Sequence, residues 1–282
     1  MDRPIATIAK TKAIMAEFGL YPNKGFGQNF IIEPKIIEKI AQASQADKNT
    51  AVIEVGPGIG ALTEQLAIVA RSVLAFEIDK KLINVLAHTL SDYDNVKIIN
   101  EDFLTCDLNY HYQTLKQTCD QIIMVANLPY YITTTIIFKV IESKGDFSSL
   151  TFMVQKELAD RFMAKPNTKD YNALSVMLQH LYDINIVMRV SPNVFIPKPA
   201  VDSIVVRFVP KDIEDDIDQD KFFQLIKACF IQRRKTIYNN LKQYLDQDIN
   251  MILTRVGISA QRRAESLTLD EFKSLYGVIY EG

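Results

Sequence analysis

Apolar segments of strand length alternate with helical patterns along most of the chain. Short apolar runs enriched in β-branched residues predict strands at 51–55, 72–77, 96–99, 121–126, 149–154, 184–190 and 203–209. Helical spacing of apolar residues predicts helices at 61–70, 80–90, 133–143, 155–164 and 173–182. Such alternation is typical of an α/β protein with a parallel, doubly wound sheet. The last two strands have no helix between them, which predicts an antiparallel edge pair.

The pattern changes after residue 210. The segment 211–220 carries six acidic side chains and one lysine without a core pattern, which predicts a solvated linker. Apolar residues then return at helical spacing, at Phe222, Leu225, Ile226, Cys229 and Phe230. We therefore expect 1–210 to form the α/β domain with an N-terminal helical extension, and 221–282 to form a small helical domain. A helix in that extension would pack through Ile8, Met15 and Phe18.

A glycine-rich turn, Gly56-Pro57-Gly58-Ile59-Gly60, directly follows the first predicted strand and precedes a helix. This arrangement opens a nucleotide-binding βαβ unit, because glycine lets the ligand and the helix approach the turn closely. The turn also satisfies the dinucleotide fingerprint, with Glu77 near the spacing of the ribose-binding acid, so a hydride-transfer enzyme is a competing interpretation. Asp102, after the third strand, favours a ligand with ribose hydroxyls and an adenine amino group, since both are donors. Glu77 and Asp102 could each also be a solvated strand end.

The tetrapeptide Asn127-Leu128-Pro129-Tyr130 closes a strongly apolar run and is expected at the carboxyl end of a strand. Open α/β sheets bind their ligands at that end. The Asn side-chain oxygen and the backbone carbonyl before proline can both accept from one exocyclic amino group, and the Tyr ring offers a stacking face. The tetrapeptide therefore suits an amino-bearing planar ring. The alternative for it is an ordinary X-Pro turn at a strand end.

Six segments, taken in order, resemble those of the ribosomal RNA adenine N6-dimethyltransferases, a family of S-adenosylmethionine enzymes to which the erythromycin-resistance rRNA methylases are related. The matching segments run nearly end to end: Lys24 to Phe30, Val52 to Gly60, Glu77 to Asp79, Asn127 to Tyr130, Gln155 to Glu157, and Pro192 to Ser203. The resemblance implies a class I methyltransferase fold, which is Rossmann-like with a mostly parallel sheet and an antiparallel edge. It also implies S-adenosyl-L-methionine as the cofactor.

Residue roles follow from the same resemblance. The cofactor-binding residues that it implies are Gln28, Asn29, Ile31, Glu54, Gly56, Gly58, Gly60, Glu77, Ile78, Asp102, Phe103 and Asn127. The catalytic residues that it implies are Asn127, Leu128, Pro129, Tyr130 and Phe195. Asn127 and the Leu128 carbonyl would bind the adenine N6 protons, while Tyr130 and Phe195 would stack on a base taken out of its helix. Phe195 could instead belong to the core. Glu101 stands where the family usually has glycine.

The C-terminal segment is basic although the whole chain is not. The net charge is −2, yet residues 221–282 hold ten Lys or Arg and six Asp or Glu. The segment 232–241 resembles a basic segment of the family, although Tyr238 stands where arginine is common. The segment from Arg263 to Leu267 resembles the C-terminal end of the family's housekeeping enzymes. We expect RNA phosphates to bind Arg233, Arg234, Lys235, Arg262 and Arg263. The alternative is a solvated helix face.

Composition limits the remaining possibilities. A chain of 282 residues with 48% apolar content can bury a full α/β core and a small second domain. Three cysteines without CxxC spacing suggest neither a zinc site nor a disulfide framework, and no metal is expected. No apolar run reaches the roughly 20 residues of a membrane span, and no secretion signal is visible. We expect a cytoplasmic monomer that does not contact membranes.

The resemblance of the C-terminal segment implies the substrate. It favours dimethylation of two adjacent adenosines in the 3′-terminal hairpin loop of 16S small-subunit rRNA, within the immature 30S subunit. A resistance-type methylase that acts on 23S rRNA is the enzymatic alternative. A ribosome-assembly factor with a mainly binding role is the other alternative.

Overall fold

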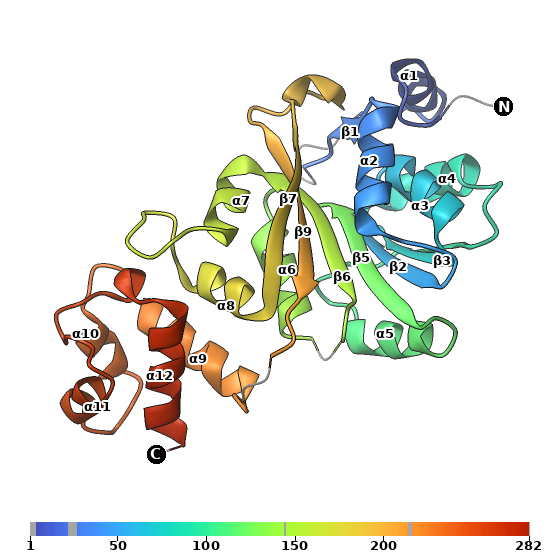
Figure 1. The fold of residues 1–282 in the computed structure, drawn as a ribbon. Helices are drawn as coiled ribbons and strands as arrows, with labels where there is room; N and C mark the ends of the chain where they lie inside the picture. Colours follow the sequence, from blue (N-terminus) through green and yellow to red (C-terminus); the bar gives the residue numbers. More distant parts are fainter. Residues whose placement is uncertain (1–3, 22–26, 144, 214–215, 282) are drawn as a thin grey trace. The chain divides into compact units, whose positions relative to one another are not determined.

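The computed structural model describes residues 4–21, 27–143, 145–213 and 216–281. The chain divides into two compact units, Met1–Lys156 with Asn185–Pro210, and Glu157–Ile184 with Lys211–Gly282 (Figure 1). Residues 157–184 therefore group with the C-terminal segment, whereas the hydrophobic pattern had placed them in the α/β domain. The periodicity of a helix shows which face is apolar but not which core receives that face. We call the two parts the sheet unit and the helical unit.

The sheet unit holds most of the expected strands and helices. Its helices are α1 (Ile8–Glu17), α2 (Pro34–Ser44), α3 (Ala61–Val69), α4 (Lys80–Thr89), α5 (Leu108–Lys116), α6 (Thr133–Ile141) and the 3₁₀ helix η2 (Pro192–Val194). Its strands are β1 (Phe30–Ile31), β2 (Thr50–Val55), β3 (Ser72–Phe76), β4 (Val96–Ile99), β5 (Gln121–Asn127), β6 (Ser149–Gln155), β8 (Phe195–Ile196) and β9 (Ser203–Pro210). Strand β7 (Tyr182–Val190) begins in the helical unit and continues into the sheet unit.

Within the described residues, the main sheet has the strand order β4-β3-β2-β5-β6-β9-β7. Strands β2 to β6 pair in parallel, and β9 pairs with β6 in the antiparallel direction. The Rossmann-like class with an antiparallel edge is thus confirmed. Strand order reverses between β2 and β5, the place where an open α/β sheet forms a crevice for ligands.

Both faces of the sheet are buried, as parallel strands require. Val52 and Ile53 point to opposite faces of β2, and each is 0% exposed. Val52 shares one hydrophobic cluster with residues of α2, α3 and α4, which cover that face. The continuous apolar strands that the sequence shows are therefore the centre of a layered core.

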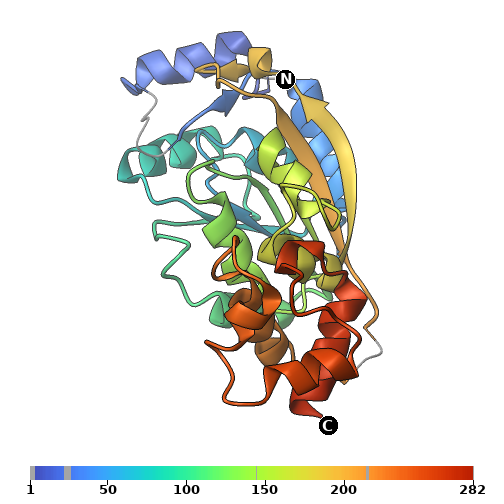
Figure 2. The same cartoon turned by 90° about the vertical axis from the view of Figure 1, so that its left-hand side faces the viewer.

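Some elements were not predicted. Helices α2 and α5 fall in segments that carried no assignment, although α2 has proline in its first turn and the Glu33 side chain as its N-cap. Strands β1 and β8 pair in the antiparallel direction across more than 160 residues of sequence, so the blue N-terminal segment lies beside the gold one in Figure 2. Two-residue strands have no periodicity to detect, and only their partner defines them.

The N-terminal helix is confirmed, but its buried face differs from the prediction. Ile8 is 53% exposed, while Thr11 and Ile14 are buried. Phe18 and Met15 pack against the hydrophobic cluster as expected. Ile5 and Ala6, just before the helix, are buried in the cluster instead of Ile8.

The helical unit contains α7 (Lys156–Phe162, from its second residue), α8 (Ala173–Leu181), α9 (Gln219–Phe230), α10 (Ile237–Leu241), α11 (Ile249–Arg255), η3 (Ala264–Ser266) and α12 (Leu269–Tyr280). The predicted apolar face of α9 is buried through Phe222, Leu225, Ile226 and Cys229. The Phe230 ring lies 5.8 Å from that of Phe272 on α12. None of the helices among the described residues is long and apolar enough to cross a membrane.

Candidate active site at the carboxyl ends of the strands

The carboxyl ends of β2, β3 and β5, with the loop after β4 and the segment before β1, surround a cavity of about 210 Å³. Sequence positions from 27 to 132 meet there because parallel strands end on the same edge of the sheet. The predicted site residues that line it are Gln28, Asn29, Ile31, Glu54, Gly56, Gly58, Glu77, Ile78, Asp102, Phe103, Asn127, Leu128, Pro129 and Tyr130. Gly60 and Phe195 do not line it. Of the predicted entry segment, residues 24–26 lie outside the described residues.

The glycine turn after β2 forms one wall of the cavity. Gly56 and Gly58 have φ values of +70° and +61°, which side-chain-bearing residues rarely adopt. A Cβ on Gly58 would also lie 3.3 Å from the Phe30 ring. The Gly58 N–H donates to Glu77 Oε2 at 3.3 Å, so the turn is linked to the end of β3.

Gly60 has a different role from the one predicted. It is the N-cap of α3 with a φ of +92°. A Cβ at this position would lie 3.1 Å from Thr89 Oγ1 and 3.2 Å from Leu90 Cδ2. Gly60 therefore allows α3 to pack closely against the end of α4, and it does not touch the ligand space.

Glu77 is held by backbone donors at the end of β3. Its Oε1 accepts from the Asp79 N–H at 2.8 Å, and its Oε2 accepts from Gly58. The carboxyl is only 5% exposed, and burial raises its pKa to about 6. Each carboxylate oxygen has a second lone pair, which is suited to accepting from ribose hydroxyls.

Glu54 is the most buried acid at the cavity. It is 1% exposed, and within the described structure its Oε2 has no hydrogen-bond partner. Burial, followed by the nearby carboxyl of Glu77, raises the pKa of Glu54 to about 8. A buried carboxyl without a partner is costly, so this position is suited to a ligand that carries a positive charge.

The loop after β4 presents Asp102 and Phe103. Asp102 Oδ1 accepts from the Leu104 N–H at 2.9 Å, and among the described residues no hydrogen bond ends on Oδ2. The Phe103 ring is buried edge-on against Phe76, with 5.5 Å between their centroids. The loop thus offers one free carboxylate oxygen beside an apolar wall, as adenine recognition requires.

Asn127 is the last residue of β5, at the cavity. Its Nδ2 donates to the Asn29 carbonyl oxygen at 3.4 Å, which leaves Oδ1 as an acceptor. The Leu128 N–H donates to the Met153 carbonyl oxygen, while in the described part of the chain no donor reaches the Leu128 carbonyl oxygen. Two acceptors therefore lie in adjacent residues, as the tetrapeptide had suggested.

Tyr130 and Phe195 are not equivalent. The Tyr130 hydroxyl lies 2.7 Å from Ser203 Oγ, and burial raises its pKa. Phe195 is 3% exposed, pairs with Ile31 through β8 and β1, and belongs to the hydrophobic cluster. The burial of Phe195 therefore favours the alternative that the sequence left open, a core residue, over a ring that stacks on the substrate base. The surrounding prolines marked a loop but did not show which way the ring points.

Tyr131 was missed by the sequence interpretation. Its ring lines the cavity and is 56% exposed, and a Cβ on Gly27 would lie 3.4 Å from it. Glu101, the departure from the family pattern, also lines the cavity. An aromatic residue directly after the tetrapeptide was the available signal for Tyr131.

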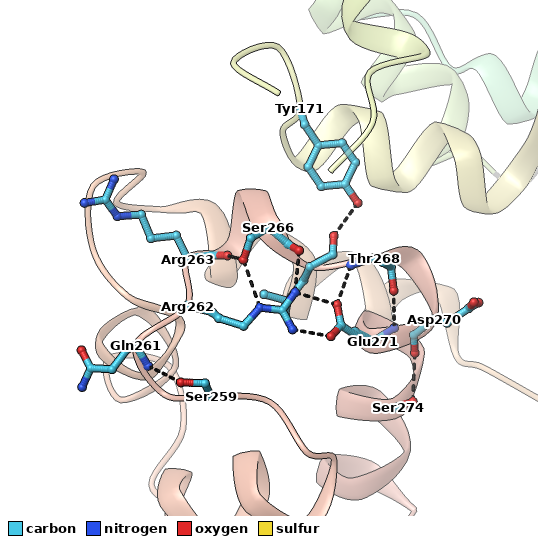
Figure 3. A network of polar contacts seen from close by, with 11 residues as sticks. Tyr171, Ser259, Gln261, Arg262, Arg263, Ser266, Thr268, Asp270, Glu271 and Ser274 are labelled. Carbon is cyan, nitrogen blue, oxygen red and sulfur yellow. Dashed lines mark hydrogen bonds and ion pairs between the residues drawn. The ribbon is translucent and has the colours of Figure 1, made fainter. Parts of the chain in front are cut away.

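The predicted basic residues of the helical unit differ in how they are held, and Figure 3 shows two of them, Arg262 and Arg263. Arg262 forms a two-pronged ion pair with Glu271 and also donates to Ser266, so it holds the start of α12 in place. Arg233 pairs with Glu265 at 3.0 Å and donates to the Lys169 carbonyl oxygen. The side chains of Arg234, Lys235 and Arg263 are exposed.

This arrangement changes the predicted basic surface. Arg262 is a structural ion-pair residue, because its guanidinium is already used by the fold. Arg233, Arg234 and Lys235 lie in a turn between α9 and α10 rather than on a helix face. The charges available to a phosphate backbone are mainly those of Arg234, Lys235 and Arg263.

Known proteins resemble this chain in both sequence and fold. The family model for ribosomal RNA adenine dimethylase matches residues 20–281. A curated relative, ribosomal RNA small subunit methyltransferase A of Bacillus cytotoxicus, is 43% identical over 281 residues, covering 97% of this chain and 96% of its own.

Two solved structures share the fold. A dimethyladenosine transferase from Plasmodium falciparum has a TM-score of 0.72 at 24% identity, covering 87% of this chain and 95% of its own. The 23S rRNA methyltransferase ErmE has a TM-score of 0.65 at 26% identity, covering 88% of this chain and 98% of its own.

Proposed function

Because the chain belongs to the ribosomal RNA adenine dimethylase family, we propose that its cavity binds S-adenosylmethionine and that it dimethylates two adjacent adenosines of small-subunit rRNA at N6. The target would be the 3′-terminal hairpin loop of 16S rRNA in the immature 30S subunit. The observation that carries the chemical part of the proposal is the Asn127 amide, whose oxygen is left free at the cavity by the bond from Nδ2 to Asn29.

The residues of the cavity fit this cofactor better than a nicotinamide dinucleotide. S-adenosylmethionine carries an ammonium group and a sulfonium, and the unpartnered oxygen of Glu54 would give a cation a buried partner. Glu77 would accept from the ribose hydroxyls, and Asp102 Oδ2 from the adenine amino group. The glycine turn would pass close to the ligand between these acids. A dinucleotide adds a pyrophosphate, which the Glu77 carboxylate would repel and which would give the buried Glu54 carboxyl no positive partner.

Catalysis would rest on the two acceptors of the tetrapeptide. The N6 lone pair is delocalised into the adenine ring, so N6 becomes a better nucleophile when its geometry departs from the plane. Asn127 Oδ1 and the Leu128 carbonyl oxygen would accept hydrogen bonds from the N6 amino group and stabilise the positive charge that develops on N6. The cofactor supplies a methyl group whose transfer forms one N–C bond, breaks one S–C bond and releases one N6 proton. Fixing the reactants in line accounts for further acceleration.

Tyr130 would provide the stacking face for the extruded adenine. Its hydroxyl, held by Ser203, fixes the ring at the cavity edge. Phe195 would support this region from the core through the β1–β8 pair. The base would therefore rest on one aromatic face from the tetrapeptide, and Tyr131 would lie beside it.

The choice of ribosomal subunit rests on the C-terminal segment and on the relatives. The fold does not distinguish between the two ribosomal subunits as substrates, because a 23S rRNA methyltransferase shares it. The curated relatives that match nearly the whole chain are small-subunit methyltransferases, which makes the large-subunit alternative less favoured. We propose that a monomer binds rRNA through Arg234, Lys235 and Arg263, with Arg233 at the edge. A ribosomal substrate would place the reaction in the cytoplasm.

A methylation assay tests the proposal. Labelled S-adenosylmethionine would be incubated with immature small subunits, free 16S rRNA or large subunits, and the rRNA would be digested to nucleosides. We expect N6,N6-dimethyladenosine from small subunits only. Label in large subunits alone would support the resistance-type alternative. Tight binding to small subunits without any methyl transfer, despite cofactor binding, would favour an assembly factor.

A further inference from the structure

Lys139 on α6 reaches the loop that follows β4. Its Nζ donates to the Leu104 carbonyl oxygen at 2.9 Å and to the Cys106 carbonyl oxygen at 2.6 Å. The same ammonium lies 5.7 Å from the centroid of the Phe103 ring, over its face. Lys139 is half-buried and does not line the cavity. Its contacts are therefore with the loop and not with the ligand space.

Two other carbonyls of this loop have their donors within the loop. The Asp102 carbonyl oxygen accepts from the N–H groups of Thr105 and Cys106, and the Phe103 carbonyl oxygen accepts from Cys106 Sγ. The carbonyls of Leu104 and Cys106 have Lys139 as their donor. Half-buried carbonyls that lose their donor are costly, so the loop would change its conformation without this ammonium.

Three residues of the loop line the cavity: Asp102, Phe103 and Leu104. Asp102 has one carboxylate oxygen tied to Leu104 and the other free, and Phe103 forms the adjoining wall. Leu104 joins the two contacts, because its carbonyl oxygen accepts from Lys139 and its N–H donates to Asp102 Oδ1. Lys139 therefore holds, from outside the cavity, the residue that binds the Asp102 carboxylate.

We propose that Lys139 is a positioning residue for cofactor recognition: its ammonium clamps the loop 102–106 so that Asp102 can accept from the exocyclic amino group of adenine. This inference rests on the proposed function, in which Asp102 binds that group. It adds that recognition of the base depends on a residue of α6, nearly forty positions further along the chain. Lys139 contributes to the choice of base without touching it.

The test compares two ligands by calorimetry. S-adenosyl-L-homocysteine has the adenine amino group, and S-inosyl-L-homocysteine has an oxygen in its place. The wild-type protein should bind the first roughly 10- to 100-fold more tightly, as expected for a hydrogen bond to a charged group. In Lys139→Met, affinity for S-adenosyl-L-homocysteine should fall by roughly 10-fold and the preference should shrink to about threefold or less.

Matched variants separate positioning from general stability. Lys116, the last residue of α5, donates in a similar way from Nζ to the Asp120 carbonyl oxygen. Lys116→Met removes this bond and should keep the wild-type preference. Lys139→Arg keeps the charge and several donors and should retain most of the preference. If Lys139→Met does not fold, Lys139→Gln serves instead, because its shorter side chain cannot span both carbonyls.

The outcomes separate the adenine contact of Asp102 from the positioning role of Lys139. Equal binding of both ligands by the wild-type protein would contradict the proposed adenine contact of Asp102. A wild-type preference that Lys139→Met or Lys139→Gln leaves intact would overturn the positioning role alone. An equal loss of affinity for both ligands, with the preference unchanged, would likewise show that Lys139 only supports the fold.

Discussion

At the scale of single residues, the Asn127 amide has the most direct link to the reaction. Its Nδ2 is engaged by Asn29, and its Oδ1 is left for the substrate. An acceptor of this kind acts mainly when N6 becomes positive. Its loss should therefore appear in turnover and not in affinity.

Asn127→Ala should lower single-turnover methyl transfer to immature small subunits by roughly 100- to 1,000-fold, the typical effect of removing one preorganised partner. Affinity for S-adenosylmethionine and for the subunit should change little. Asn127→Asp keeps an acceptor and should retain more activity than Asn127→Ala. Asn49→Ala, at an exposed position of the same unit, is the control. Near-wild-type turnover in Asn127→Ala would leave the Leu128 carbonyl and Tyr130 as the only supports for the mechanism.

Glu54 predicts a pH dependence of stability. In the unfolded chain this carboxyl titrates near its usual pKa of 4.5, whereas in the folded protein burial raises the pKa to about 8. The folded state then binds the proton of Glu54 more tightly than the unfolded state does. The stability that this proton contributes is therefore lost as pH rises from 4.5 towards 8. The upper bound of this loss is about 4 to 5 kcal/mol.

Glu54→Gln keeps the shape of the side chain without its charge. Urea unfolding at pH 5 and pH 9, without ligand, should show that the variant gains stability relative to wild type at pH 9 but not at pH 5. Glu33→Gln, a half-exposed acid that caps α2, provides the comparison. A pH-independent difference between Glu54→Gln and wild type would show that the buried carboxyl does not carry this penalty.

At the scale of elements, most long strands and helices could be predicted because their apolar periods are long. The short pair β1–β8 could not, since two residues carry no period. Gly60 illustrates the same limit. The glycine pattern marked it as a ligand residue, but the close approach of α3 and α4 is what requires it.

Gly60→Ala should destabilise the protein by about 1 to 3 kcal/mol, because it combines a left-handed backbone with a Cβ that meets Thr89 and Leu90. Gly257 also has a positive φ, +67°, and no described atom lies within 4 Å of a Cβ added there, so Gly257→Ala and Gly19→Ala (φ +58°, likewise open) are the comparisons. The open-position variants should therefore lose less stability than Gly60→Ala. Chemical unfolding of all three variants measures the difference. Equal losses would mean that helix packing adds nothing to the backbone strain.

At the scale of the whole molecule, charge is distributed unevenly, with a basic C-terminal segment in an overall acidic chain. Pairing within the helical unit reduces the usable charge, because Arg262 and Arg233 are bound to Glu271 and Glu265. Arg234 and Lys235 stay exposed in the turn after α9. Binding to rRNA should therefore depend on this pair more than on Arg262.

Neutralising the pair in Arg234→Gln with Lys235→Gln should weaken binding to immature small subunits and lower the salt slope of the binding constant by about 1 to 2. Cofactor affinity should not change. The matched control is Lys80→Gln with Lys81→Gln, which neutralises two adjacent exposed lysines of the sheet unit. Titrations at several salt concentrations provide the measurement. An unaltered slope in the Arg234 and Lys235 variant would assign these residues to a solvated surface.

The sequence by itself determined the fold class, the edge of the sheet that holds the site and the residues of the tetrapeptide. These follow from local information, since strand periods, glycine turns and motifs are read over a few neighbouring positions. The same local information pointed to Glu77 and Asp102, and the family resemblance added Gln28 and Asn29.

Only the tertiary structure decided which side chains face the cavity and which are used by the fold. Phe195 turned out to be a core residue, Gly60 a packing glycine and Arg262 an ion-pair residue, while Tyr131 joined the cavity wall. In each case the deciding partner lies far away in sequence or on another element. The direction and pairing of a side chain depend on those distant partners, and a local pattern does not contain them.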